Sequence, residues 1–93
     1  MDKYTPLNIT TATTTTVKSG AGVLKSITIN KGIATGVITI YDNTAASGTK
    51  IGTITFGAAL VSDPPVTGIY DAAFATGLTV VTSAATDITV SYK

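Results

Sequence analysis

Residues 36–56 read GVITIYDNTAASGTKIGTITF, and this stretch predicts a β-hairpin. Ile38 and Ile40 fall on one face of the first limb, because successive side chains of a strand point in opposite directions. Tyr41 then falls on the other face. The letters DNTAASG that follow are rich in residues that bond their own backbone or tolerate positive φ, so we expect the chain to reverse direction there.

The return limb shows the same alternation with one interruption. Ile54 and Phe56 share a face, whereas Ile51 is out of step with them by one residue. Gly52 lies between, at a position where a glycine can accept a β-bulge. A bulge there would turn all three apolar side chains toward the core.

Composition extends this prediction to the whole chain. Twenty threonines, ten isoleucines and eight valines dominate its 93 residues, while the strong helix formers are scarce. Short alternating segments recur between turn signals at roughly 8 to 12 residue spacing. The expected fold is therefore all-β: a small antiparallel β-sandwich, jelly-roll-like, with seven or eight short strands.

Further strands are expected at residues 13–18, 23–30, 66–70, 77–81 and 87–92. In 23–30 the alternation turns Val23, Ile27 and Ile29 inward, but Lys25 breaks the row. A bulge, or a strand end exposed to solvent, would let Leu24 face the core in its place. Residues 71–74 read as a connection that buries Phe74. Residues 57–61 fit either a helical turn or a buried strand. Residues 62–65 contain two prolines and are expected to form a loop or polyproline corner.

The chain is expected to form one domain, residues 22–93, preceded by residues 1–21 as an N-terminal arm or edge strand. Pro6 favours an edge or an arm because it cannot donate a ladder hydrogen bond. The start, MDKYTPLNITT, contains no apolar run of signal-peptide length, and no apolar stretch is long enough to span a bilayer. We therefore expect synthesis in the cytosol and no membrane partner.

The chemistry available to the chain is narrow. It contains no Cys and no His, and its charge comes from six Lys and five Asp, a net charge of +1. Disulfides and the common zinc sites are excluded, so a small core can be supplemented only by oligomerisation. The lysines are dispersed, which argues against nucleic acid as a partner and fits solubilisation of strand edges.

No catalytic motif emerges, and we expect no catalytic, cofactor-binding or metal-binding residues. Asp42 and Asn43 could offer oxygen ligands to calcium, but turn formation explains the same pair. A sugar platform would need Tyr41 to lie beside Tyr70 or Tyr4. These observations favour a protein that works through its surfaces.

The C-terminal three quarters, about residues 22–93, resembles small β-rich virion proteins of tailed bacteriophages. The similarity rests on the following segments: Ile40-Tyr41-Asp42, Ser47-Gly48-Thr49, Ile69-Tyr70-Asp71, Phe74, Thr76-Gly77-Leu78, Val80 and Asp87-Ile88-Thr89-Val90-Ser91-Tyr92. Such motifs specify packing, and proteins of this group serve as capsid auxiliary proteins or as tail and fibre modules.

The resemblance implies a capsid decoration (cement) protein, made in the host cytoplasm and located on the capsid surface of the virion. Its expected partners are further copies of itself, as a trimer, and the major capsid protein or another virion protein. The alternative is a receptor- or glycan-binding module of a tail fibre or spike; a host enzyme or calcium protein ranks below both. The expected partner contacts are Tyr4, Pro6, Leu7, Tyr41 and Tyr70.

Overall fold

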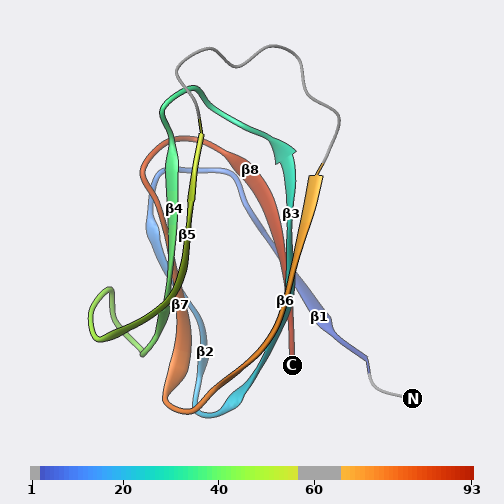
Figure 1. Ribbon diagram of the computed structural model, residues 1–93, viewed down its shortest axis with the longest axis vertical. Coiled ribbons are helices and arrows are strands. Elements are labelled where there is room, and N and C mark those ends of the chain that lie inside the picture. The colour runs from blue at the N-terminus through green and yellow to red at the C-terminus, as the bar shows by residue number, and fades with distance from the viewer. Residues whose placement is uncertain (1–2, 57–65) are drawn as a thin grey trace.

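In residues 3–56 and 66–93, which the computed structural model describes, the chain forms eight strands and no helix. The strands are β1 (Thr5–Ile9), β2 (Thr14–Ser19), β3 (Gly22–Lys31), β4 (Val37–Asp42), β5 (Thr49–Thr55), β6 (Val66–Phe74), β7 (Gly77–Thr82) and β8 (Asp87–Tyr92). They make two four-stranded antiparallel sheets, in the orders β1-β8-β3-β6 and β2-β7-β4-β5. The two sheets form the two layers seen in Figure 1.

The strand pairing follows a single rule. Each strand pairs with the strand equally far from the other end of the series: β4 with β5, β3 with β6, β2 with β7 and β1 with β8. The fold is thus one long hairpin whose tip is β4–β5, rolled up so that alternate pairs enter different sheets. Pairing of β3 with β8 and of β4 with β7 completes each sheet. This is the jelly-roll topology, and it confirms the expected all-β sandwich.

The hairpin at the tip is formed as its alternation predicts. Ile40 of β4 lies opposite Gly52 and the next residue, Tyr41, lies opposite Lys50, so Ile51 is the extra residue of a bulge. Ile51, together with Ile54 and Phe56 farther along the same limb, packs against the core. The predicted bulge is therefore present, and it turns all three apolar side chains toward the core.

A second bulge, in β3, changes which of its side chains face the core. The register with β8 shifts because Leu24 lies opposite Tyr92 and Ser26 lies opposite Ser91, which leaves Lys25 as the extra residue of β3. Against β6 the extra residue is on β6, where Tyr70 and Asp71 both stand between the partners of Leu24 and Ser26. Leu24 is fully buried and Val23 is half-buried. Of the two explanations expected for Leu24, a bulge or a strand end exposed to solvent, the structure shows the bulge, which overrides the simple alternation that turned Val23 inward.

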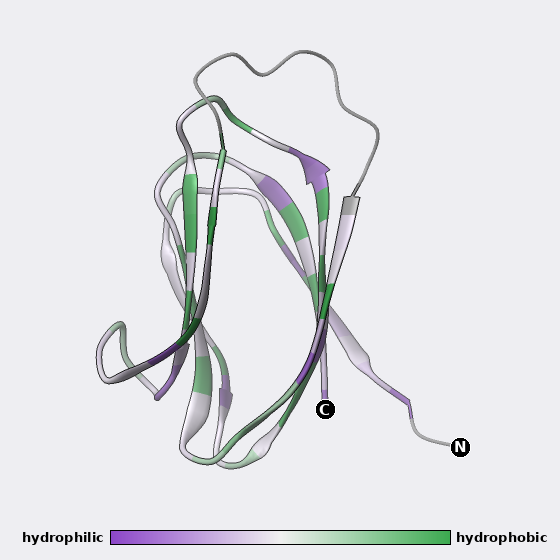
Figure 2. Ribbon diagram, viewed as in Figure 1, coloured by the Kyte–Doolittle hydropathy of each residue, from purple (hydrophilic) through white to green (hydrophobic). Residues whose placement is uncertain are grey.

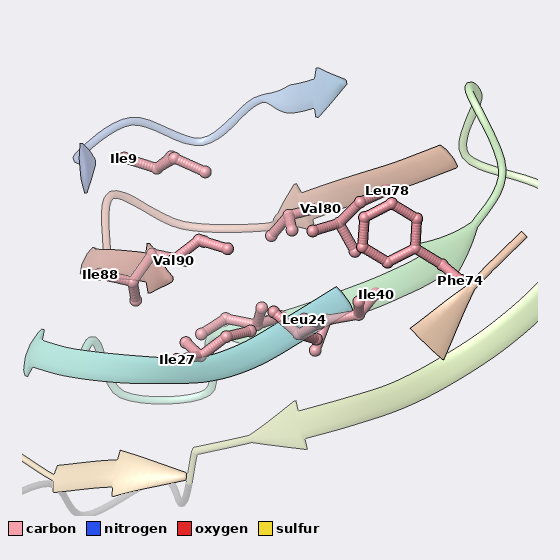
Figure 3. Close-up of a cluster of buried hydrophobic side chains, with 10 residues drawn as sticks. Ile9, Leu24, Ile27, Ile40, Phe74, Leu78, Val80, Ile88 and Val90 are labelled. Carbon is pink, nitrogen blue, oxygen red and sulfur yellow. The ribbon is translucent and has the colours of Figure 1, made fainter. Parts of the chain in front are cut away.

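The core lies between the two sheets and is mainly aliphatic. Side chains from both layers point toward one another in Figure 3, with Phe74 as the one buried aromatic ring among the described residues. The buried set is Ile9, Leu24, Ile27, Ile38, Ile40, Phe74, Leu78, Val80, Ile88 and Val90. Leu78, Val80, Ile88 and Val90 are the inward residues that alternation predicted for the last two strands.

One connection was predicted wrongly. Residues 71–74 continue β6 as strand, because Leu24 and Gly22 of β3 pair with Ala72 and Phe74. Asp71 accommodates the irregularity with a φ of 47°, a left-handed conformation that aspartate tolerates better than most residues. Phe74 is nevertheless buried, as expected. The segments 57–61 and 62–65 lie outside the described residues.

The N-terminal segment contributes one edge strand to each sheet. β1 pairs along its whole length with β8, from Thr5 opposite Tyr92 to Ile9 opposite Ile88. Between β1 and β2 the chain is held by Thr82, whose Oγ1 donates to the carbonyl of Thr11 at 2.6 Å and accepts from the N–H of Thr13 at 3.1 Å. Residues 5–19 therefore lie within the sandwich.

Candidate interaction surfaces

The first outer face, on the sheet β1-β8-β3-β6, is built from two rows of short side chains that cross all four strands. The strand registers place these residues side by side: Pro6, Ser91, Ser26 and Ile69 in one row, and Asn8, Thr89, Thr28 and Thr67 in the next. None of the eight carries a charge. Figure 2 shows that strongly hydrophilic residues occupy only short parts of the strands.

Hydrogen bonds between neighbouring strands hold this face in place. The Nδ2 of Asn8 donates to Asp87 Oδ1 at 2.7 Å, and the Nδ2 of Asn30 donates to the same oxygen at 3.2 Å. The hydroxyls of Thr28 and Thr67 lie 3.0 Å apart. Because these groups are already ordered, covering them with another protein would cost little side-chain entropy.

The second outer face, on the sheet β2-β7-β4-β5, is also threonine-rich. Its two rows are Thr14, Val81, Thr39 and Thr53, and then Thr16, Thr79, Tyr41 and Lys50. The β4–β5 loop folds back onto part of this face: Thr79 Oγ1 donates to the carbonyl of Asn43 at 2.8 Å, and Thr16 Oγ1 to that of Thr44 at 3.1 Å. Thr79 is fully buried as a result.

Asp42 anchors this loop to the β6–β7 turn. Its Oδ1 accepts the backbone N–H groups of Ala75 at 3.1 Å, Thr76 at 2.9 Å and Gly77 at 3.4 Å. Hydrogen bonds from Thr76 and Ala75 lower the pKa of the Asp42 carboxyl below its usual value, since they favour the ionised form. The carboxylate thus acts as a clamp, because it fixes the backbone of the β6–β7 turn to the end of β4.

The loop residue Asn43 has a structural role as well. Its Oδ1 accepts the N–H of Thr44 at 2.8 Å, and its Nδ2 donates to the carbonyl of Ser47 at 2.8 Å. Gly48, with a φ of 85°, completes the turn. Among the described residues, no group of three or more His, Cys, Asp or Glu side chains is placed to hold a metal ion.

Tyr4 precedes β1 and lies beside two lysines. The Nζ of Lys93 is 5.5 Å from its ring centroid and that of Lys25 is 5.8 Å away, both within cation–π range. Lys25 also forms an ion pair with Asp71 at 2.9 Å. The hydrogen bond to Asp71, and then its charge, raise the pKa of Lys25. Tyr4 is therefore held at one end of the sandwich.

Pro6 and Leu7 lie on opposite faces of β1. Pro6 is exposed opposite Ser91, whereas Leu7 is opposite Val90 and packs against the core. Of the two, only Pro6 presents its side chain to the first outer face.

Tyr41 and Tyr70 lie on opposite sides of the sheet β2-β7-β4-β5. Tyr41 belongs to the second outer face, next to the fully buried Ile40. The ring of Tyr70 lies against the inner side of Gly52, the residue opposite Ile40, and packs on the core. Burial raises the pKa of the Tyr70 hydroxyl. The three tyrosines considered for a sugar platform thus occupy three separate places.

One prominent surface residue was not singled out from the sequence. Ile69, on β6, is 68% exposed and is the large hydrophobic side chain that stands out on the described surface. The signal was available: its neighbours Gly68 and Tyr70 take the inward positions, so alternation must turn Ile69 outward.

Comparison of the chain with family models, with curated proteins and with solved structures found no match in any of the three. The surfaces themselves must therefore support any assignment of function. In the described part of the chain, no helix is long and apolar enough to cross a membrane.

Proposed function

We propose that this protein is a non-enzymatic structural protein of a virus particle, a decoration protein that self-associates and covers a capsid surface. Its jelly-roll topology is one that recurs in viral capsid and lectin domains. A fold of this kind hosts many functions, so function has to be inferred from the surface of the chain.

The observation that carries the proposal is the low charge of the central rows of both outer faces. The charged residues of the first sheet lie outside these rows; they are Lys25, Lys31, Asp71 and Asp87. Charged residues make up 12% of the chain, about half of the roughly 25% typical of soluble domains. The four rows described above contain sixteen positions, of which Ser26 and Thr79 are already buried within the chain; one of the sixteen, Lys50, is charged. Short uncharged side chains suit a surface that is covered by protein over much of its area, because they lose little freedom when buried.

The mechanism of such a protein is repeated contact. Each copy would present a modest, flat patch, and linked copies would bind a symmetric lattice with an avidity above that of any one contact. Association would also stabilise the small aliphatic core, because binding free energy adds to folding stability.

A glycan-binding module of a tail fibre or spike has less support. Sugar platforms are usually built from adjacent aromatic rings. Tyr41 lies on the outer side of the sheet β2-β7-β4-β5, whereas the ring of Tyr70, from β6 of the other sheet, lies against its inner side. Tyr4 lies beside Lys25 and Lys93. No pair of these rings forms a platform.

The proposal is tested by mixing the purified protein with undecorated bacteriophage capsids and sedimenting them. Saturable binding at a symmetry-related copy number supports it. A matched pair of variants then locates the contact: Thr89→Lys places a charge on the first outer face and Thr39→Lys on the second. Loss of binding in one variant is expected. Binding that is unchanged in both, or a protein that ignores capsids but binds a glycan array, would overturn the proposal.

A further inference from the structure

Strand edges in a two-sheet sandwich expose unpaired backbone groups that invite pairing with other chains. The edge strands of the two described sheets are β1, β6, β2 and β5, and three of them contain a feature that opposes such pairing. β1 contains Pro6, which lacks an N–H donor. β2 has a register irregularity between Thr16 and Lys18, with the lysine at its end, and β5 has the bulge at Ile51 next to Lys50. Bulges and lysines are both common means of protecting an edge.

The fourth edge, β6, lacks such protection in its first half. Residues 66–69 keep a regular register with β3, from Val66 opposite Ile29 to Ile69 opposite Ser26. The irregularity of this strand, and its ion pair with Lys25, come later, at Asp71. The unprotected half contains no charge and no proline, and it includes the 68% exposed Ile69. In the described residues, β6 pairs with β3 alone.

We propose that the first half of β6 is a docking edge for a second copy of this chain, which pairs with it antiparallel about a two-fold axis at Gly68. In this register Ile69 of each copy lies opposite Thr67 of the other, on the first outer face. Cross-strand pairs of β-branched residues stabilise sheets. A side chain can be introduced at Gly68 without crowding its own chain, since a Cβ there would meet nothing nearer than the Ile27 carbonyl oxygen at 3.9 Å.

A second copy is the occupant that this edge fits. An uncharged segment offers nothing to select a partner of opposite charge, whereas an isologous contact needs only a segment that is complementary to itself. Thr67-Gly68-Ile69 meets that requirement. The inference deepens the self-association on which the proposed function depends, and it specifies a dimer where the resemblance to virion proteins suggested a trimer.

Cysteine cross-linking tests the register directly, because the chain contains no cysteine of its own. Directly opposed residues of antiparallel strands have Cα atoms about 4.5 to 5.5 Å apart, within disulfide range. Gly68→Cys should therefore form a covalent dimer under mild oxidation, whereas Thr67→Cys, one position from the axis, and Thr53→Cys, exposed on β5, should not. Equal cross-linking of all three variants, or none in Gly68→Cys, would overturn the two-fold register.

Sedimentation at a series of concentrations tests the contact without a cross-link. Ile69→Lys should raise the dimer dissociation constant by about tenfold or more, because a charge on an edge opposes pairing. Thr53→Lys is the matched control and should leave it unchanged, with circular dichroism verifying the fold of both variants. A wild-type trimer, or a dimer that tolerates Ile69→Lys, would refute the β6 contact while leaving self-association intact. A strictly monomeric wild type would refute both, and the capsid assay separately tests decoration.

Discussion

The ring of Tyr70 on β6 lies 3.0 Å from the position that a Cβ would occupy at Gly52 on β5. The two residues belong to different sheets, so this contact links the edges of the two layers. The missing side chain of Gly52 is what gives the ring its space. Tyr70 is thus part of the packing of the sandwich, and the glycine in the bulged strand is explained by its partner.

Substitution of Gly52 tests whether the packing of Tyr70 requires a glycine at this position. Gly52→Val should destabilise the protein by about 1 to 3 kcal/mol, because the new side chain overpacks against the ring. In a Tyr70→Ala background the same substitution should cost less, with a coupling of about 0.5 to 3 kcal/mol. Urea unfolding of the four proteins of this cycle measures both quantities. An identical cost in the two backgrounds would contradict the contact.

A second pair of glycines should respond in opposite ways. A Cβ at Gly22 would clash with the backbone oxygen of Lys93 and lie 2.7 Å from the Phe74 ring, so Gly22→Ala should cost about 1 to 3 kcal/mol. At Gly68 the space is open, and Gly68→Ala should add about 0.4 to 1 kcal/mol by restricting the unfolded chain. Thermal unfolding of the two variants at equal protein concentration provides the comparison. Equal responses would show that the crowding at Gly22 is relieved by local movement.

The bulge in β3 predicts unequal effects for neighbouring residues. Leu24→Ala should destabilise the protein by about 2 to 5 kcal/mol, because it leaves a cavity in the fully buried core. Lys25→Ala should have little effect, since its ion pair with Asp71 lies at the surface. Chemical denaturation distinguishes the two. A small cost for Leu24→Ala would mean that the strand is not bulged at this position.

The clamp formed by Asp42 predicts a dependence on pH. Because the folded state lowers the pKa of this carboxyl, the ionised form stabilises the fold, and that contribution is fully present above the ordinary aspartate pKa of about 3.9. It is lost as the pH falls through the lower folded value. Asp42→Asn should therefore reduce the Tm at pH 7, and the difference from wild type should shrink in acid. A difference that stays constant between pH 7 and pH 2 would argue against the clamp.

Local patterns were sufficient to predict much of the fold. Alternation placed Ile38, Ile40, Leu78 and Val80 in the core. The bulge near Gly52 followed from an apolar residue that was out of step, and a lysine in an inward row suggested the bulge at Lys25. The pattern misled at residues 71–74, which were expected to form a connection but continue β6, with Asp71 at a positive φ within the strand. A strand irregularity of this kind depends on its neighbour β3, which the local sequence does not contain.

The candidate surfaces were only partly predictable. The outward direction of Tyr41 followed from its place beside Ile40. The separation of Tyr41 from Tyr70, the position of Tyr4 beside Lys93, and the bonds from Asn8 and Asn30 to Asp87 join residues far apart in the chain. None of these contacts has a local signature.

By itself, the sequence determined most of the strands, most of the turns and most of the side chains that face inward, because alternation and turn formation are properties of the local backbone. The tertiary structure decided the order of the strands, the edge that is left unprotected and the rows that cross each outer face. Strand pairing uses backbone groups that nearly every residue carries, so the choice of partner is settled only when the whole chain closes around its core.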